Sequence, residues 1–222
     1  MTVRNRGALA AMAAGAAALT VAAVVACGAQ PEGVGSADAE RLAAATGAPS
    51  VTATGPTGSR VPVTTGNLPT TTGTVPPARL RIPAIDLTAT VEEVGVDART
   101  GEFDVPPSVD RIGWYRYGPG LEAERGSVVV AGHVDSATQG RGAFYRLREL
   151  DRGDTLTVTG RDGRDREYRV VAREKYDKTR IPLDRYFARD GAARLTLITC
   201  GGPFDAAARR YRDNIVVTAV PG

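Results

Sequence analysis

The sequence predicts an all-β domain in the later part of the chain. Short apolar runs rich in β-branched residues recur there with turn residues between them, a pattern typical of short strands. Helical signals are confined to residues 142–150 and 182–187, and every aromatic residue lies at or after Phe103. A small closed or nearly closed β-barrel fits this pattern, because closure removes exposed strand edges. A β-sandwich is the competing architecture, since periodicity alone does not separate the two.

The N-terminal residues have the order of an export signal. Arg4 and Arg6 precede an uncharged, alanine-rich stretch of 19 residues, Ala8–Ala26. That stretch matches a secretory signal or a weak membrane anchor. It ends in Val-Val-Ala-Cys-Gly around Cys27, which resembles a bacterial lipobox. A lipidated Cys27 and an uncleaved anchor both place the rest of the chain at the extracellular face of the membrane, so we expect residues 1–27 to tether it there.

Residues 28–78 form the second predicted segment. They are mainly Ala, Gly, Thr, Pro and Ser, with few charges and no aromatic residue. Such a composition cannot bury enough apolar surface to offset chain entropy, so we expect a disordered linker. As a flexible coil it would span roughly 40 Å. The folded domain is then predicted at 79–222.

The strands of that domain can be followed along the chain. Leu-Arg-Ile at 80–82 is a short predicted strand that is followed by a break at Pro83, and a β-branched run follows at 88–96. Residues 127–133 are continuously apolar, as expected of a strand buried on both faces.

The later strands include a hairpin. Residues 155–159 and 167–173 flank Arg-Asp-Gly-Arg at 161–164, where the Asp-Gly pair favours a tight turn. Apolar runs at 195–200 and 214–220 complete the set.

Charge and cysteine content exclude several kinds of function. The 28 basic and 25 acidic residues give a net charge of +3 and are interleaved, as on an ordinary solvated surface. A nucleic-acid-binding protein would show a patch of one sign, so we expect no nucleic-acid partner. The two cysteines form no cluster that would hold a structural metal, and no group of acids demands calcium. We therefore expect neither a metal nor a cofactor.

Two residues stand out as candidates for chemistry. His133 is the only histidine, and Cys200 is the only cysteine outside the apolar leader. Each ends an apolar β-like run. Taken alone, each is more simply a buried cysteine or a hydrogen-bonded histidine. Together they suggest a thiol site, because a cysteine nucleophile needs a histidine to manage its proton.

Arg212 is the third candidate. It opens the last apolar strand, twelve residues after Cys200, so the two residues can lie on adjacent strands. An arginine stays charged at any working pH and can stabilise an oxyanion or hold a substrate carbonyl. On composition alone it is one more surface arginine.

Three further residues are candidate supports. Asp135 follows His133 by two positions, so strand alternation can put both on one face, where Asp135 would orient the imidazole. A capping role in a loop is the alternative. Thr199 would point to the face opposite Cys200, and its backbone would matter more than its hydroxyl. Asn214 can share a face with Arg212.

Several motifs resemble those of one family, the sortases. Residues 196–200, Thr-Leu-Ile-Thr-Cys, match the sortase motif Thr-Leu-x-Thr-Cys at every fixed position. Similar motifs are Gly-His-Val-Asp-Ser at 132–136, Tyr-Arg-Asp-Asn-Ile-Val-Val at 211–217 and Leu-Arg-Ile-Pro-Ala-Ile at 80–85. Residues 112–115 and 142–147 most resemble the actinobacterial class F sortases, with class E as the neighbouring group.

The resemblance implies a specific fold and reaction. Sortases are eight-stranded barrels outside the membrane of Gram-positive bacteria. They are cysteine transpeptidases that cut a Leu-Pro-x-Thr-Gly-type sorting signal between Thr and Gly. By this resemblance Cys200 forms the thioacyl intermediate. His133 protonates the leaving amine and deprotonates the incoming one, and Arg212 steadies the oxyanion or binds the signal backbone. The implied partners are surface proteins with a C-terminal sorting signal and a cell-wall precursor amine, such as that of lipid II.

Two other functions compete with this one. An L,D-transpeptidase would carry Ser/Thr-His-Gly-Cys at its nucleophile, whereas Ile-Thr-Cys-Gly at 198–201 lacks that histidine. A tethered sortase-like barrel without turnover could be a cell-wall module. The presence of His133, Cys200 and Arg212 together argues against that.

Overall fold

The computed structural model of the chain describes residues 33–45, 74–97 and 103–222. The predicted leader 1–27, Cys27 and most of the predicted linker lie outside these ranges. Within the described ranges, no helix is both long and apolar enough to span a membrane.

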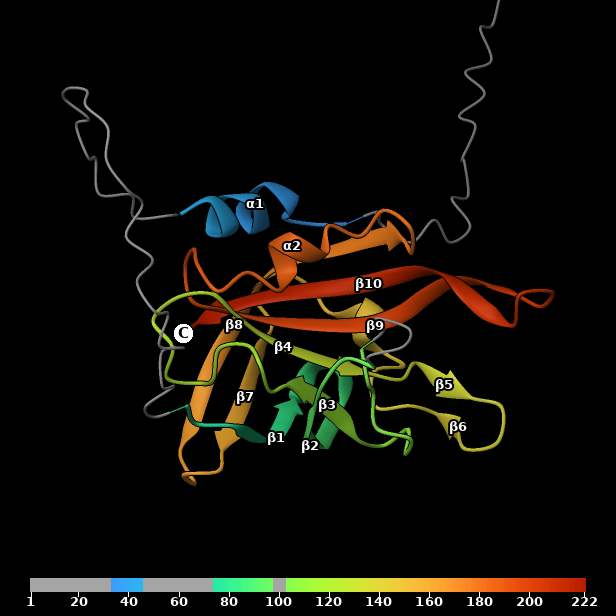
Figure 1. Ribbon diagram of the computed structural model, residues 1–222, viewed down its shortest axis with the longest axis horizontal. Coiled ribbons are helices and arrows are strands. Elements are labelled where there is room, and N and C mark those ends of the chain that lie inside the picture. Colours follow the sequence, from blue (N-terminus) through green and yellow to red (C-terminus); the bar gives the residue numbers. More distant parts are fainter. Residues whose placement is uncertain (1–32, 46–73, 98–102) are drawn as a thin grey trace, which may run out of the picture. The chain divides into compact units, whose positions relative to one another are not determined.

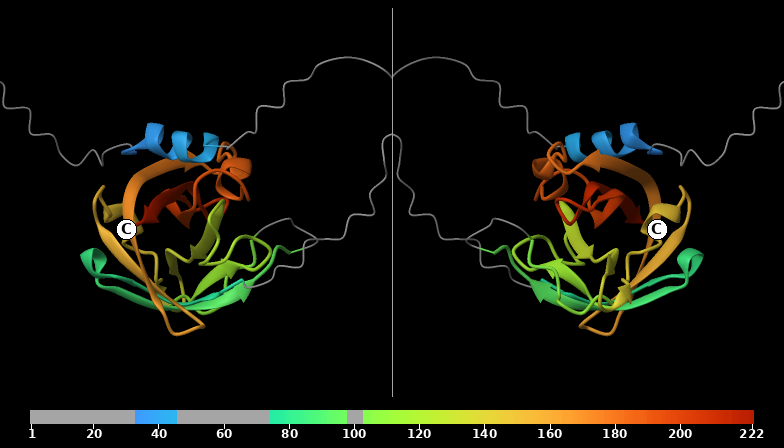
Figure 2. Two further views of the ribbon diagram at one scale, coloured as in Figure 1. Left: turned by 90° about the vertical axis from the view of Figure 1, so that its left-hand side faces the viewer. Right: turned by 90° about the vertical axis from the view of Figure 1, so that its right-hand side faces the viewer.

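Eight strands form a closed barrel in the order β1-β2-β3-β4-β9-β10-β8-β7 (Figures 1 and 2). The strands are β1 (Pro77–Ile82), β2 (Leu87–Val94), β3 (Ile112–Tyr115), β4 (Ser127–Gly132), β7 (Thr155–Gly160), β8 (Asp165–Asp177), β9 (Arg194–Asp205) and β10 (Arg210–Pro221). A separate two-stranded ribbon joins β5 (Asp135–Ser136) to β6 (Gly140–Arg141). The predicted all-β barrel is confirmed, and the sandwich is excluded because the first and last strands of the order, β1 and β7, pair with each other.

The helices are short. They are α1 (Ser36–Ala44), the 3-10 turns η1 (Pro83–Ile85) and η2 (Leu147–Glu149), and α2 (Leu183–Tyr186). The helix predicted over 142–150 is therefore only one 3-10 turn, and the one predicted over 182–187 is one α-helical turn. Strands β8, β9 and β10 extend beyond their predicted ranges, because their polar ends form regular ladder pairs that apolar periodicity does not mark.

Helix α1 lies inside the segment predicted as a disordered linker, and for residues 33–45 that prediction does not hold. Val34 and Arg173 exchange backbone hydrogen bonds of 2.7 and 2.8 Å, so the segment bridges to β8. The carbonyl of Leu42 accepts a hydrogen bond from Ala192 N at 2.9 Å. Alanine favours helix and fits under close packing, and Ala39 is buried here. Backbone pairing supplies the stability that the composition alone does not indicate.

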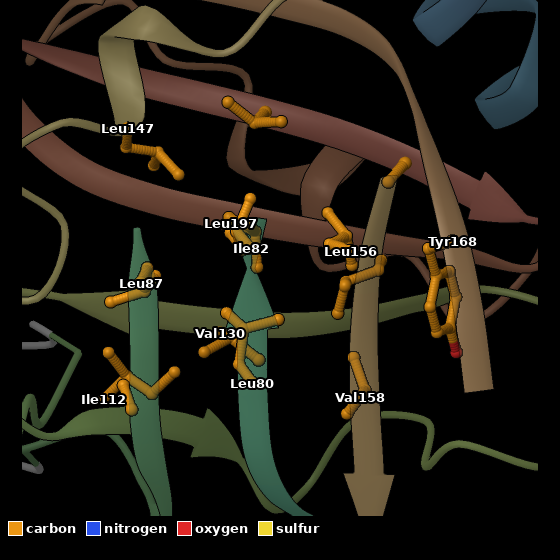
Figure 3. Close-up of a cluster of buried hydrophobic side chains, with 14 of the residues drawn as sticks. Leu80, Ile82, Leu87, Ile112, Val130, Leu147, Leu156, Val158, Tyr168 and Leu197 are labelled. Carbon is orange, nitrogen blue, oxygen red and sulfur yellow. The ribbon is translucent and has the colours of Figure 1, made fainter. Parts of the chain in front are cut away.

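The barrel interior is a single apolar cluster. Alternate residues of each strand point inward, as Leu80, Val130, Leu156 and Leu197 do in Figure 3. Strand β4 is buried at all six positions, so the prediction of a strand covered on both faces is confirmed.

Two pairs of barrel strands are parallel, β2 with β3 and β4 with β9, and the other pairs are antiparallel. The β4–β9 pair matches Ser127 with Arg194 and continues in register to Ala131 with Ile198. Because the two strands run in the same direction, their carboxyl ends emerge at the same edge of the barrel.

Truncating the core should destabilise the fold. Leu197 is fully buried, so Leu197→Ala is expected to lower the free energy of unfolding by about 2–5 kcal/mol through lost burial and the cavity left behind. Chemical denaturation measures this loss. The matched control is Leu183→Ala, because Leu183 is 52 % exposed and its loss should cost less than about 0.5 kcal/mol. Equal losses in the two variants would contradict the assignment of the core.

Candidate active site

The parallel pairing of β4 and β9 places His133 and Cys200 at equivalent positions along two adjacent strands. Partners along this pair differ by a constant 67 positions, and the Thr199 hydroxyl donates to Gly132 O at 2.8 Å with the same offset. Continuing that register by one residue sets His133 against Cys200. Neighbouring strands lie about 4.8 Å apart. The structure thus brings the two predicted residues together, with His133 directly after the end of β4 and Cys200 within the neighbouring strand β9.

The loops around His133 fix its backbone and its ring. Its carbonyl accepts a hydrogen bond from Phe144 N at 3.1 Å. Its Nε2 lies 2.9 Å from Pro106 O, and because a carbonyl only accepts, Nε2 carries the hydrogen. In the neutral imidazole Nδ1 is then the nitrogen with a free lone pair. Gly142 permits the close approach of the neighbouring loop, since a Cβ there would lie 2.3 Å from His133 O.

Cys200 lies where two cavities meet. The smaller, of about 160 Å³, is lined by Phe144, Tyr145, Arg148, Thr199 and Ile215 among others. The larger, of about 680 Å³, contains His133, Lys178, Phe204, Arg209 and Arg210 in its wall. Val134, Asp135, Cys200 and Tyr211 line both. A group bound in either cavity can therefore reach the sulfur, and one bound in the larger cavity can also reach the imidazole.

Thr199 and Asn214 hold the strand that carries Cys200. Thr199 is buried, and its hydroxyl ties β9 to the end of β4, so the hydroxyl has a structural partner that the sequence analysis did not assign. Asn214 pairs directly with Cys200 across the β9–β10 ladder. Both residues thereby fix the height of Cys200 on the barrel edge.

Arg212 lies on the strand next to Cys200, as predicted, but outside both cavities. A β-bulge at this end lies in β9, because residues 201–204 of β9 are opposite only the three residues 211–213 of β10. Alternation along β10 is therefore unbroken, and Arg212 shares the face of Asn214. Its side chain is exposed, and its guanidinium helps to lower the pKa values of Asp177 and Asp205. The main cause of each shift is hydrogen bonding, to Thr179 for Asp177 and to the backbone N–H of Ala208 for Asp205.

Asp135 contacts a tyrosine in place of the predicted histidine. Its carboxylate accepts a hydrogen bond from the Tyr211 hydroxyl, while Pro106 holds the His133 ring. The hydrogen bond to Asp135, followed by burial, raises the pKa of Tyr211 to about 12. Tyr211 was not predicted as a site residue, although it directly precedes Arg212 on the same strand. The Tyr211–Asp135 pair stands at the boundary between the two cavities.

Positive charge gathers around the thiol. Arg148 lines the smaller cavity, Lys178, Arg209 and Arg210 line the larger, and Asp135 is the acid that lines both. The sequence as a whole has nearly equal numbers of basic and acidic residues, so this bias is local. Spacing along the chain does not reveal it, because the cations come from η2, from the β8–β9 connection, from the β9–β10 turn and from the start of β10.

The arrangement suits acyl transfer through a thiol. A cysteine can supply a nucleophile, a histidine with one free nitrogen can move a proton, and nearby cations can stabilise a developing oxyanion. Among the described residues there is no group of three or more His, Cys, Asp or Glu side chains that could hold a metal ion.

Comparison with known proteins identifies the family. A family model described as the sortase domain matches residues 80–222, which is more than half of the chain. No curated protein matches the chain.

Solved structures share the fold at low sequence identity. Sortase C-1 from Actinomyces oris aligns with a TM-score of 0.50 and 21 % identity, covering 65 % of this chain and 72 % of that one. A lid mutant of sortase A from Corynebacterium diphtheriae gives 0.50 and 21 %, with 68 % and 73 % covered. A pilus-related sortase C of group B Streptococcus gives 0.51 and 12 %, with 66 % and 67 % covered.

The Tyr211–Asp135 contact predicts a pH effect. Because the folded-state pKa of Tyr211 is raised above the ordinary value of 10.0, the contact stabilises the fold fully below pH 10 and loses its effect as the pH rises towards 12. Asp135→Asn should bring the pKa of Tyr211 back towards 10. NMR titration of ¹³C-labelled tyrosines measures it, with Tyr211→Phe identifying the resonance. The control Asp165→Asn, which alters a carboxylate bound to Thr159, should leave it unchanged. A Tyr211 pKa near 10 before any substitution would contradict the contact.

Proposed function

The chain belongs to the sortase family, and we propose that it is a cysteine transpeptidase acting on a Leu-Pro-x-Thr-Gly-type sorting signal. It cleaves the signal between Thr and Gly through a thioacyl intermediate on Cys200 and transfers the threonine carbonyl to an amine. The placement of His133 and Cys200 at one level, in the wall of one cavity, is the observation that carries this proposal.

The proposed reaction exchanges one amide for another. The Cys200 thiolate attacks the threonine carbonyl carbon, and the oxyanion collapses as the C–N bond to glycine breaks. His133 carries on Nδ1 the proton taken from the Cys200 thiol, and it gives that proton to the leaving amine. An incoming amine then attacks the thioester carbon and loses a proton to His133, and the thiolate leaves. No atom changes its oxidation state in these steps. The free nitrogen of the neutral ring, Nδ1, is the atom we assign to proton transfer, since Nε2–H is held by Pro106 O.

Arg212 is assigned to the oxyanion or to the signal backbone. Its support is its position on β10, on the face that carries Asn214 opposite Cys200. Because the side chain is exposed, it is free to turn towards a bound signal.

The same proposal covers the substrates, the acceptor and the cellular location of the enzyme. The substrates are surface proteins with a C-terminal sorting signal, and the acceptor is an amine of a cell-wall precursor such as lipid II. The product is a protein anchored to the cell wall. The N-terminal segment, by anchor or by lipidated Cys27, holds the enzyme at the extracellular face of the membrane of a Gram-positive actinobacterium. Within the family we assign the chain to class F, on the motifs at 112–115 and 142–147.

A peptide assay tests the reaction. The chain should cleave a quenched Leu-Pro-x-Thr-Gly peptide after threonine and, with added amine, form the amide product seen by mass spectrometry. Cys200→Ala should lower the rate by more than about 10⁴-fold, because the thioacyl intermediate cannot form. Leu183→Ala is the control for handling and folding.

A folded chain that cleaves none of a panel of sorting peptides, and whose Cys200 resists alkylation, would indicate a cell-wall module without turnover.

Substituting Arg212 tests its role separately. Arg212→Gln should lower kcat/KM for the peptide by about 100-fold, the usual cost of removing a donor to an oxyanion. Arg164→Gln, at the exposed tip of the β7–β8 hairpin, should leave kcat/KM within twofold or so of the parent, as for most surface substitutions. Equal activity in the two variants would remove Arg212 from the mechanism.

A further inference from the structure

We propose that the larger cavity selects an acceptor amine that carries an anionic group close to the reacting nitrogen. This inference rests on the proposed transpeptidase function and names the chemistry of its second substrate.

The position of His133 decides which cavity receives the amine. The incoming nitrogen must give up its proton as it attacks the thioester, so it has to approach on the side of the imidazole. His133 lines the larger cavity and not the smaller one. The acceptor therefore enters through the larger cavity.

The charge of that cavity determines which second functional group the acceptor molecule carries beside its amine. Its wall holds Lys178, Arg209 and Arg210. Asp135 is the acid among the residues of this wall, and it already accepts a hydrogen bond from Tyr211. Of the acids beyond the wall, Asp205 lies near Arg210 and helps to hold the adjoining turn by accepting hydrogen bonds from the N–H groups of residues 207 and 208.

Among the described side chains, none of the three cations is held in an ion pair, and Asp205 acts on Arg210 only electrostatically. Within the residues that the structure describes, none of the three side chains forms a salt bridge or a side-chain hydrogen bond. In its protonated form a plain amine is a cation and would be repelled by this wall. An anion on the same molecule reverses that repulsion and adds charge-assisted hydrogen bonds.

The backbone of Arg209 supports a functional role for its side chain. Arg209 has φ of 51°, in the left-handed region that favours glycine. A non-glycine residue held there costs conformational free energy, and such costs gather at functional sites. The turn thus keeps a strained arginine where it lines the cavity.

A carboxylate and a phosphate share the required chemistry, and paired acceptors separate them. Glycylglycine is compared with its C-terminal amide, and phosphoethanolamine with ethanolamine, each at equal concentrations of unprotonated amine. We expect the anionic member of at least one pair to have a kcat/KM about tenfold higher. The pair with the larger ratio identifies the anion. The ratio should shrink as added salt shortens the Debye length to about 3 Å near 1 M.

The variants place the preference in this cavity. Arg210→Gln and the combined change of Lys178, Arg209 and Arg210 to Gln should reduce the ratio towards one. Arg164→Gln should keep it. Because the ratio compares two acceptors on the same acyl-enzyme, a change in the first half-reaction cancels out.

A binding measurement keeps the inference testable without turnover. The full chain carrying Cys200→Ala is titrated with glycylglycine, glycylglycinamide, phosphoethanolamine and ethanolamine, and backbone amide shifts are followed by NMR. Shifts at residues 178, 209 and 210 with an anionic compound, absent with its neutral partner, support the proposal. Equal shifts, or none, overturn it.

The two proposals fail in different ways. If Cys200 is not acylated by any sorting peptide, the transpeptidase function fails, and the binding titration alone decides whether the cavity takes anionic amines. If Cys200 is acylated and hydroxylamine captures the acyl group, but anionic amines react no faster than neutral ones, the acceptor inference alone fails.

Discussion

The parallel pairing of β4 with β9 is the constraint on which the site depends. In an antiparallel pair the ends of two strands point in opposite directions, and residues that follow them emerge at opposite edges. Here the two strands run in the same direction with a constant offset, so His133, which follows β4, lies beside Cys200 within β9. Fully buried side chains such as Leu195 and Leu197 hold that register, because a shift by one residue would turn them out of the core.

The rest of the site is built around this edge by loops that hold it through backbone groups. The carbonyl of Pro106 orients the His133 ring, and the loop at 142–144 packs on the His133 backbone. The Tyr211 hydroxyl reaches across to Asp135, so the β9–β10 hairpin is joined to the β5–β6 ribbon that follows His133. Figure 1 shows these two hairpins projecting on the same side of the barrel. Because each contact comes from a different part of the chain, the geometry depends on the whole barrel being closed.

A buried carboxylate supports the connection that brings Lys178 to the cavity. Glu174, at 4 % exposure, accepts hydrogen bonds from Tyr186 at 2.7 Å and Tyr176 at 2.8 Å, and pairs with Arg185 at 2.9 Å. A buried charge is tolerated only when it is paired and hydrogen-bonded, and this one is. Burial, with hydrogen bonds from this cluster, raises the pKa of Tyr186 far above its ordinary value. The cluster ties β8 to α2 and so fixes the path of the segment between β8 and β9.

The sequence by itself determined the all-β class, seven of the eight barrel strands and the pair of chemical residues, whereas β3 (Ile112–Tyr115) was not predicted as a strand. Alternating and continuous apolar runs mark which residues turn inward, and a single histidine with a single cysteine outside the leader leaves one choice of thiol site. Tertiary structure alone decided the parallel register, the Tyr211–Asp135 contact, the histidine held by Pro106 and the cationic wall of the larger cavity. It also placed residues 33–45 against the barrel. These features join residues far apart in the chain, and period-two patterning fixes the face of a strand but not its neighbour. Which strands pair, and in which direction, follows from closing one core, and that is a property of all the strands together.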